Sequence, residues 1–474
     1  MFYLINKRAY NYTVYDDVDG TVGEIDETSV LCILSKGLIS ISGISSKTTN
    51  GYTVFFTDES YKDSIFISRS IKGDGYIDKA VMLADKLGYK SYNLDIICNC
   101  SEEDYLITKM LGFSLDKKSS DDKCDIYYGN NTIKVIFKKK LKYINGIFLG
   151  GFECGNIIIK GLDLSMAHEL SLMFVCVTAD EIKFENVNFS NIKNIHNMFD
   201  NCTITKVDLS NTDFSDVEFV KLIASETFIH ELDLSGCDFS NARKFSSAFE
   251  GCSITDLKMN GMRCGKLKTM ANMFSDFIGD YVEMDFDTSG VSDMSMMFSH
   301  AKIKKVILDK LDTSSVVTME SMFLDCKTSR IDVSGMDTGK VKTMTNMFSL
   351  VHLDSLDLSN FNTSNVINMS GMFKESEIGN LNISSFKLNK SPNMSNMFSK
   401  FNSDILDLSM FNIANAKVNR VFYKVSLQKL RLNSSLLNKL SVSDFTKAHI
   451  GSIDITDEEN ISNSVLNILE YLGQ

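Results

Sequence analysis

A phenylalanine, usually preceded by methionine, returns along this chain at an almost constant interval. The intervals are 25 residues almost throughout, with two of 24 and one of 50, whose midpoint is Ala224 in a degenerate unit. Self-similarity at such a period is typical of solenoids, in which each repeat contacts only its neighbours. The pattern predicts about eleven stacked coils. The phenylalanines are Phe174, Phe199, Phe249, Phe274, Phe298, Phe323, Phe348, Phe373, Phe398 and Phe422.

Each repeat contains a short stretch in which apolar and polar residues alternate. It begins eight residues after the phenylalanine, and it reads VDLS at 207–210 and LDLS at 356–359 and 406–409. Alternation with a period of two is typical of a strand that buries one face. We therefore expect one strand in each coil, paired in parallel with the strands of the neighbouring coils.

The second half of each repeat has a helical spacing of apolar residues. In NTSNVINMSGMF, residues 362–373, the apolar side chains recur at i, i+3, i+6 and i+7. This spacing predicts one or two helical turns, with Thr363 or Ser364 capping the first amide groups. Each repeat is then one coil of a right-handed parallel stack, with the Met-Phe pair in its interior. The apolar residues of this unit are Val366, Met369, Met372 and Phe373.

The repeat LDLSNFNTSNVINMSGMF resembles the BspA-type leucine-rich repeat, which occurs in many bacterial surface and interaction proteins. The resemblance covers residues 157–445. It implies a leucine-rich-repeat solenoid that recognises a protein partner, or a surface adhesin. Many adhesins of this kind are secreted, but the opening MFYLINKRAYNYTVYDD lacks the basic start and apolar stretch of a signal peptide. A cytoplasmic location is therefore expected, and the cell surface is the alternative.

Residues 446–474 are predicted to cap the stack. The repeat pattern drifts after Leu430, and the chain closes with TDEENISNSVLNILEYLG. The apolar residues of this stretch share one helical face, which favours a helix over the last coil with Thr456 or Asp457 as its N-cap. These apolar residues are Ile461, Val465, Ile468, Leu469 and Leu472.

Residues 1–150 show no 25-residue period and are predicted to form a separate α/β domain. Helices are expected near 76–87 and 102–111. The fold class of the whole chain is therefore predicted as α/β, with a mixed domain followed by the repeats and a capping helix. The expected strands lie near 12–16, 21–25, 38–42, 52–57, 64–70, 92–97, 125–128 and 132–137.

A Gly-x-Gly turn stands between a predicted strand and helix of this first domain. Glycines let a backbone approach an anion, and a helix N-terminus supplies free amide groups. The order of elements resembles the GNAT acetyltransferase superfamily, which implies acetyl-coenzyme A binding at this turn. The matching residues are Ile71, Lys72, Gly73, Asp74, Gly75 and Tyr76.

The sequence also departs from that superfamily. Ser70 stands where the family usually has Gln or Arg, Asp74 would place an anion beside the phosphates, and Thr108 replaces the usual general-acid tyrosine. The catalytic residues are therefore unknown. An unrelated α/β domain that docks on the first coil is the alternative.

Composition excludes some classes of function. The net charge of −12 argues against a nucleic-acid-binding protein, which needs a concentrated basic face. No apolar run reaches the roughly 18 residues of a membrane span. Cys98 and Cys100 have no second cysteine pair at metal-ligand spacing, so no metal site is predicted.

Three other cysteines share one slot, three residues after the repeat phenylalanine. They are Cys202, Cys252 and Cys326. A recurring slot of this kind is typical of small buried hydrophobic residues rather than of disulfide partners, which fits a reducing compartment.

The second position of the predicted strand is acidic or amide in many coils. Neighbouring parallel strands lie about 4.8 Å apart, and like charges at that spacing repel by about 1 kcal/mol in water. Either the carboxylates are solvated and close turns, or a basic segment of a protein partner lies across them; a cation site is a third option. The residues are Asp208, Asp233, Asp332, Asp357 and Asp407, with Asn382 in the same row.

These patterns lead to three functional hypotheses. The first is a protein–protein interaction scaffold that recognises its partner through the repeat surface. The second is an N-acetyltransferase that uses the repeats to recruit a protein substrate. The third is a bacterial surface adhesin.

Overall fold

The computed structural model describes residues 153–473, apart from 166, 172, 224–225, 389, 391, 412–415 and 458–460. Before residue 153 it describes only the ten strands β1 to β10. The helices predicted at 76–87 and 102–111 and the strands predicted at 21–25 and 38–42 lie outside the described residues. The chain divides into two compact units, Met1–Phe239 and Ser240–Gln474.

The first unit begins with a small sheet in the order β3-β2-β4-β1-β5. Three of its strands confirm the predictions at 12–16, 52–57 and 64–70. Its strands are β1 Phe2–Asn6, β2 Tyr12–Tyr15, β3 Ile44–Ser45, β4 Val54–Thr57 and β5 Ser64–Ser68.

A longer sheet of the same unit joins the N-terminal segment to the first coils. Its order is β18-β16-β14-β11-β6-β9-β8-β7, and every pair from β18 to β9 is parallel. Strands β6, β8 and β9 confirm the predictions near 92–97, 125–128 and 132–137. Because β6 pairs with β11, the sheet crosses the boundary expected near residue 150. The strands are β6 Asn93–Ile97, β7 Ser114–Leu115, β8 Cys124–Gly129, β9 Thr132–Phe137, β11 Glu153–Lys160, β14 Thr178–Glu185, β16 Thr203–Asp208 and β18 Phe228–Asp233.

A second side of these coils carries its own ladder, in the order β10-β13-β15-β12, with β17 paired to β15. All of its pairs are parallel. The strands are β10 Phe148–Leu149, β12 Glu169–Ser171, β13 Phe174–Val175, β15 Asn194–Asp200 and β17 Phe219–Ile223.

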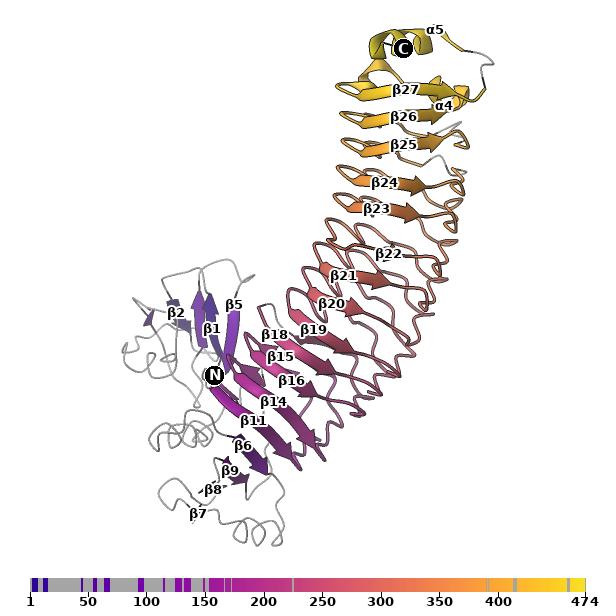
Figure 1. The fold of residues 1–474 in the computed structure, drawn as a ribbon. Coiled ribbons are helices and arrows are strands. Elements are labelled where there is room, and N and C mark those ends of the chain that lie inside the picture. Colours follow the sequence, from indigo (N-terminus) through magenta and orange to yellow (C-terminus); the bar gives the residue numbers. More distant parts are fainter. Residues whose placement is uncertain are drawn as a thin grey trace. The chain divides into compact units, whose positions relative to one another are not determined.

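The parallel strands of the second unit form two ladders, β22-β21-β20-β19 and β23-β24-β25-β26-β27 (Figure 1). The chain is a mainly β parallel solenoid of about 12 turns of about 25 residues, with little helix. The predicted α/β class and the count of eleven coils are corrected accordingly. The strands are β19 Ser253–Lys258, β20 Ile278–Val282, β21 Lys302–Ile307, β22 Ile331–Asp332, β23 His352–Asp357, β24 Glu377–Asn382, β25 Asn402–Leu408, β26 Ser426–Leu432 and β27 His449–Ile455.

The helical turn predicted in each repeat is wrong. Residues 363–373 form turns and a single β-bridge. In the preceding coil, Asn346 and Leu350 have φ of 52° and 62°, a left-handed conformation that an α-helix does not contain. The Phe348 amide between them donates to the Met372 carbonyl of the next coil at 2.9 Å. The backbone therefore bonds from coil to coil rather than within a helix.

The predicted helix cap at Thr363 also has another role. The Thr363 hydroxyl is buried, accepts from the amide of Lys387 at 2.7 Å and donates to the carbonyl of Lys387 at 3.0 Å. Thr288, Thr313 and Thr338 likewise donate into the next coil, at 2.9–3.1 Å. These threonines form a column of buried hydroxyls that joins successive coils.

The predicted interior column of phenylalanines is confirmed. Phe323, Phe348 and Phe373 are fully buried. Their rings stack with centroids 5.3 and 5.9 Å apart and interplanar angles of 7°. In the first unit, Phe174 and Phe199 stack in the same way at 5.1 Å.

The three slot-matched cysteines are buried, as predicted. Cys202, Cys252 and Cys326 are at most 2% exposed, and all three are free thiols. Burial, with a smaller contribution from the Asp325 carboxylate, raises the pKa of Cys326 to about 12. Such a thiol stays protonated at neutral pH and behaves as a small apolar side chain.

The repeats continue past their predicted end at 445. Phe445, in the 3-10 helix η2 Val442–Phe445, stacks on Phe422 at 5.1 Å, and β27 pairs with β26 in parallel. A short helix α4, Ser434–Leu437, precedes this last coil. The sequence pattern did not predict this coil because the interval from Phe422 to Phe445 is shorter than the 24 or 25 residues of the other repeats.

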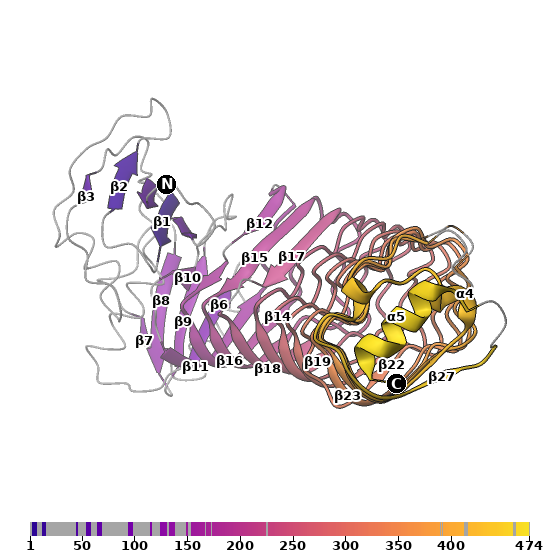
Figure 2. The same cartoon turned by 90° about the horizontal axis from the view of Figure 1, so that it is seen from above.

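The predicted capping helix is present as α5, Asn463–Leu472, which lies across the last coil (Figure 2). It buries Val465 and Ile468. Its N-cap is Ser462 rather than the predicted Thr456 or Asp457. Thr456 and Asp457 follow directly on β27, which ends at Ile455, and so they lie too far before Asn463 to cap the helix. The Thr456 amide still donates to the Leu432 carbonyl in the ladder, at 2.9 Å.

Candidate functional site

The exposed side chains of the parallel strands form one surface of each unit, which we call the strand face. Buried and exposed residues do not alternate strictly along these strands. In β23, Leu353 and Leu356 are buried, and the two residues between them are both exposed. Each strand of this kind thus presents its first, third, fourth and sixth residues, so the strand face is denser in polar groups than simple alternation would give.

The acidic residues predicted to bind a partner all lie at strand ends and close turns. Asp357 accepts from the amide of Ser359 at 2.9 Å. Asp208 accepts from both the amide and the hydroxyl of Ser210, at 3.0 and 2.7 Å. Local bonds of this kind satisfy the carboxylate without a partner. The same bond to the serine two residues on is made by Asp233, Asp332, Asp407 and Asn382.

Neighbouring charges in this row are partly compensated. Arg330 donates to Asp332 at 2.7 Å. Arg431 bridges two coils by donating to Asp407 at 3.0 Å and to Asp454 at 3.1 Å. Hydrogen bonds from Ser334 and then Arg330 hold the pKa of Asp332 below its usual value. The structure thus brings these residues into one row, as predicted, and occupies at least one oxygen of each.

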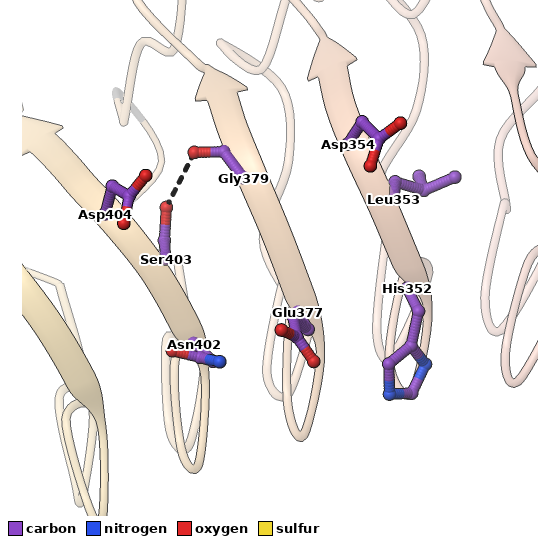
Figure 3. A pocket seen from close by; sticks show the side chains of 8 residues that line it. All are labelled: His352, Leu353, Asp354, Glu377, Gly379, Asn402, Ser403 and Asp404. Carbon is purple, nitrogen blue, oxygen red and sulfur yellow. Dashed lines mark hydrogen bonds between the residues drawn. The ribbon is translucent and has the colours of Figure 1, made fainter.

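A hollow of about 430 Å³ lies on the strand face of β23, β24 and β25. Gly379 lies between Asp354 and Asp404, and its missing side chain leaves the space between the two carboxylates open (Figure 3). Glu377 and His352 line the same hollow. A Cβ on Gly379 would lie 2.7 Å from the carbonyl oxygen of Asp354, so only glycine fits here without a shift.

The acidic groups of this hollow have no partners among the described residues. The side chains of Asp354, Glu377 and Asp404 are exposed and make no ion pair or hydrogen bond there. Three carboxylates that lack compensation on adjacent strands repel one another. The sequence did not predict this cluster because the residue types at these positions change from coil to coil. The available signal was Gly379, which has Asp354 one repeat before it and Asp404 one repeat after it.

Other predicted sites lie outside the described residues. They are the proposed acetyl-coenzyme A turn at Ile71, Lys72, Gly73, Asp74, Gly75 and Tyr76, together with Ser70, Thr108, Cys98 and Cys100. In the part of the chain that the structure describes, no three His, Cys, Asp or Glu side chains are arranged to hold a metal ion. The helices of that part are all too short or too polar to span a bilayer.

The repeats match a known protein family. A family model described as "Mycoplasma protein of unknown function, DUF285" matches residues 168–281, 280–354 and 331–435. These segments cover more than half of the chain. The protein belongs to the DUF285 family.

The three DUF285 matches fall within the coiled part of the chain and carry no functional assignment. No curated protein matches the chain, and no solved structure matches it. The comparisons therefore support a repeat solenoid and give no support to a leucine-rich-repeat or acetyltransferase assignment.

Proposed function

We propose that this DUF285 protein is an interaction scaffold whose strand face binds a basic segment of a protein partner. The observation that carries the proposal is the uncompensated cluster of Asp354, Glu377 and Asp404 around the hollow between β23 and β25. A cationic segment laid across these strands relieves their mutual repulsion. Carboxylates that are already exposed also lose little hydration when a long lysine side chain reaches them.

The turn-closing aspartates support the same surface from its edge. Asp357 is the last residue of β23 and Asp407 the last but one of β25, and a serine amide anchors each carboxylate. Anchored carboxylates present negative charge in a fixed place, which favours specificity and fast association over raw affinity.

A lysine-rich peptide is the probe that tests this proposal. We expect a labelled peptide to bind the full chain in a salt-dependent manner, measured by fluorescence anisotropy at low ionic strength. The triple variant Asp354→Asn, Glu377→Gln, Asp404→Asn should bind about threefold to a hundredfold more weakly, since each exposed charge contact contributes about 0.2–1 kcal/mol and a tenfold change corresponds to about 1.4 kcal/mol.

The matched control removes the same charge elsewhere. Glu169→Gln, Asp180→Asn and Glu320→Gln alter three exposed acids outside the hollow. This variant should bind the peptide nearly as the wild type does. Equal weakening in both triple variants would show that only net charge matters, and the proposed site would be wrong.

Acetyl-coenzyme A binding stays a prediction from the Gly-x-Gly turn. Titration calorimetry of the full chain at millimolar ligand should show binding if the turn receives a pyrophosphate, and Gly75→Val should abolish it because a side chain there obstructs the phosphates. No binding by the wild type would remove the acetyltransferase alternative.

The expected cytoplasmic location is likewise a proposal. Cell fractionation should place the protein in the cytoplasmic fraction. An adhesin would instead be found at the cell surface, where protease added to intact cells would cleave it.

A further inference from the structure

A column of lysines runs along one corner of the last coils. Lys400, Lys424 and Lys447 are exposed, and each has a left-handed backbone, with φ of 58°, 55° and 60°. The Lys400 amide donates to the Tyr423 carbonyl at 2.7 Å. The Lys424 amide donates to the Thr446 carbonyl at 3.0 Å. Because these two bonds are the same contact between one coil and the next, the three lysines occupy one position in three successive coils.

Only the first of these lysines is compensated. Glu375 has the same position one coil before Lys400, and the Lys400 ammonium lies 3.2 Å from its carboxylate. Side chains of this column therefore meet across neighbouring coils. Lys424 and Lys447 form no ion pair with any residue that the structure describes. Their ammonium groups belong to coils about 4.8 Å apart, and they repel each other.

A tyrosine gathers a further cation at this corner. The guanidinium carbon of Arg420 lies 5.7 Å from the centroid of the Tyr423 ring, and the Lys424 ammonium nitrogen lies 5.4 Å from it. Arg420 is exposed and has no ion pair among the described residues. An aromatic ring attracts cations without neutralising them. We call Arg420, Tyr423, Lys424 and Lys447 the basic corner.

The acidic residues close to the basic corner in the sequence are engaged or lie elsewhere. Asp444 is buried, and its carboxylate accepts from the amide and the hydroxyl of Ser441, at 3.0 and 2.9 Å. Among residues 392–424 the only acids are Asp404 and Asp407, which belong to β25. The basic corner is therefore a local concentration of positive charge on a chain whose net charge is −12.

The backbone of the basic corner is already hydrogen-bonded. The Lys424 amide is used between coils, and the Lys447 amide donates to the Tyr471 hydroxyl at 3.4 Å. A site for a small phosphate usually relies on free backbone amides. Here long side chains on an exposed edge are what reaches outward, which suits an extended surface that carries many phosphate groups. We propose that the basic corner binds the phosphate headgroups of an anionic membrane surface.

The two tyrosines of this region fit the same partner. Tyr423 is half-buried, and Tyr471 on α5 is 49% exposed. A tyrosine combines an apolar ring with a polar hydroxyl, and so it favours the headgroup level of a bilayer. A single-stranded nucleic acid instead stacks its bases on open aromatic faces. Arg420 and Lys424 already lie over the Tyr423 ring, which disfavours that alternative.

The number of uncompensated cations predicts the strength of binding. Each Lys or Arg near an anionic surface strengthens binding about fivefold, so three of them contribute about a hundredfold. Attachment of this kind is reversible and is weakened by salt. The inference goes beyond the proposed function, because the basic corner shares no residue with the hollow on the strand face.

Co-sedimentation of the full chain with lipid vesicles tests the proposal. We expect binding to vesicles of equal parts phosphatidylglycerol and phosphatidylcholine at low ionic strength, and none to vesicles of phosphatidylcholine alone. The variant Arg420→Asn, Lys424→Asn, Lys447→Asn should lower the partition coefficient by about a hundredfold. Asparagine is chosen because it tolerates the left-handed backbone of these positions.

The matched control removes three lysines of the strand face. Lys302, Lys305 and Lys327 are exposed and form no ion pair with the described residues. The variant Lys302→Gln, Lys305→Gln, Lys327→Gln changes the net charge by the same amount and should bind the vesicles nearly as the wild type does. Lys424→Arg with Lys447→Arg keeps the charge of the basic corner and should also bind.

A wild type that does not bind the anionic vesicles overturns the inference, as does equal weakening in both triple variants. Saturable binding of inorganic phosphate at submillimolar concentration, measured by calorimetry without vesicles, would instead show a small-anion site. Tighter binding of a glutamate-rich peptide or an oligonucleotide than of the vesicles would contradict the membrane surface as the partner.

Discussion

Phe348→Ala is expected to lower the free energy of unfolding by about 3–5 kcal/mol, as truncation of a buried aromatic ring does. The Phe348 ring is fully buried and stacks on Phe323 and Phe373, at 5.3 and 5.9 Å. Its loss opens a cavity between two coils and removes both stacking contacts at once. Urea unfolding of the full chain followed by circular dichroism measures the change.

The control for this prediction is Phe219→Ala. Phe219 is 41% exposed, so its removal should cost far less than that of Phe348. A loss below about 1 kcal/mol for Phe348→Ala would mean that the ring is not a structural part of the interior column. Because each coil contacts only its neighbours, a cavity at one coil should also weaken the cooperativity of the stack.

The interior of the coils could be predicted from the sequence because a constant interval places equivalent residues in equivalent positions, whatever conformation joins them. Val366, Met369, Met372 and Phe373 are all fully buried, as their spacing suggested. The conformation itself could not be predicted from that spacing. Two left-handed residues four apart turn the chain so that the same four side chains point inward without a helix.

A signal for these turns was nevertheless present. The first left-handed position is Asn in four coils and Gly in another, namely Asn197, Asn272, Asn346, Asn396 and Gly371, whereas Ser247, Met296, Ser321 and Arg420 occupy it elsewhere. Both residue types tolerate a positive φ better than most others. The apolar spacing is the stronger of the two signals, because it matches the period of a helix and the turn residues do not recur strictly.

The candidate site was only partly predictable. The repeated aspartates, such as Asp357, were visible because they recur, and they recur because each closes a turn with a serine two residues on. Asp354, Glu377 and Asp404 do not follow a repeated pattern. Residues that vary between coils reveal a surface only after the strand register places them side by side, and so the acidic cluster around Gly379 could not be predicted without the structure.

Thr363→Val is expected to lower the free energy of unfolding by about 1–3 kcal/mol, although it nearly preserves side-chain shape. The buried Thr363 hydroxyl accepts from the Lys387 amide at 2.7 Å and donates to the Lys387 carbonyl at 3.0 Å. Valine satisfies neither backbone group, while Thr363→Ser keeps the hydroxyl and should retain most of the stability. The same urea unfolding experiment compares the three proteins. Equal stability of the valine variant and the wild type would mean that water reaches the Lys387 backbone, and that the threonine column does not join the coils.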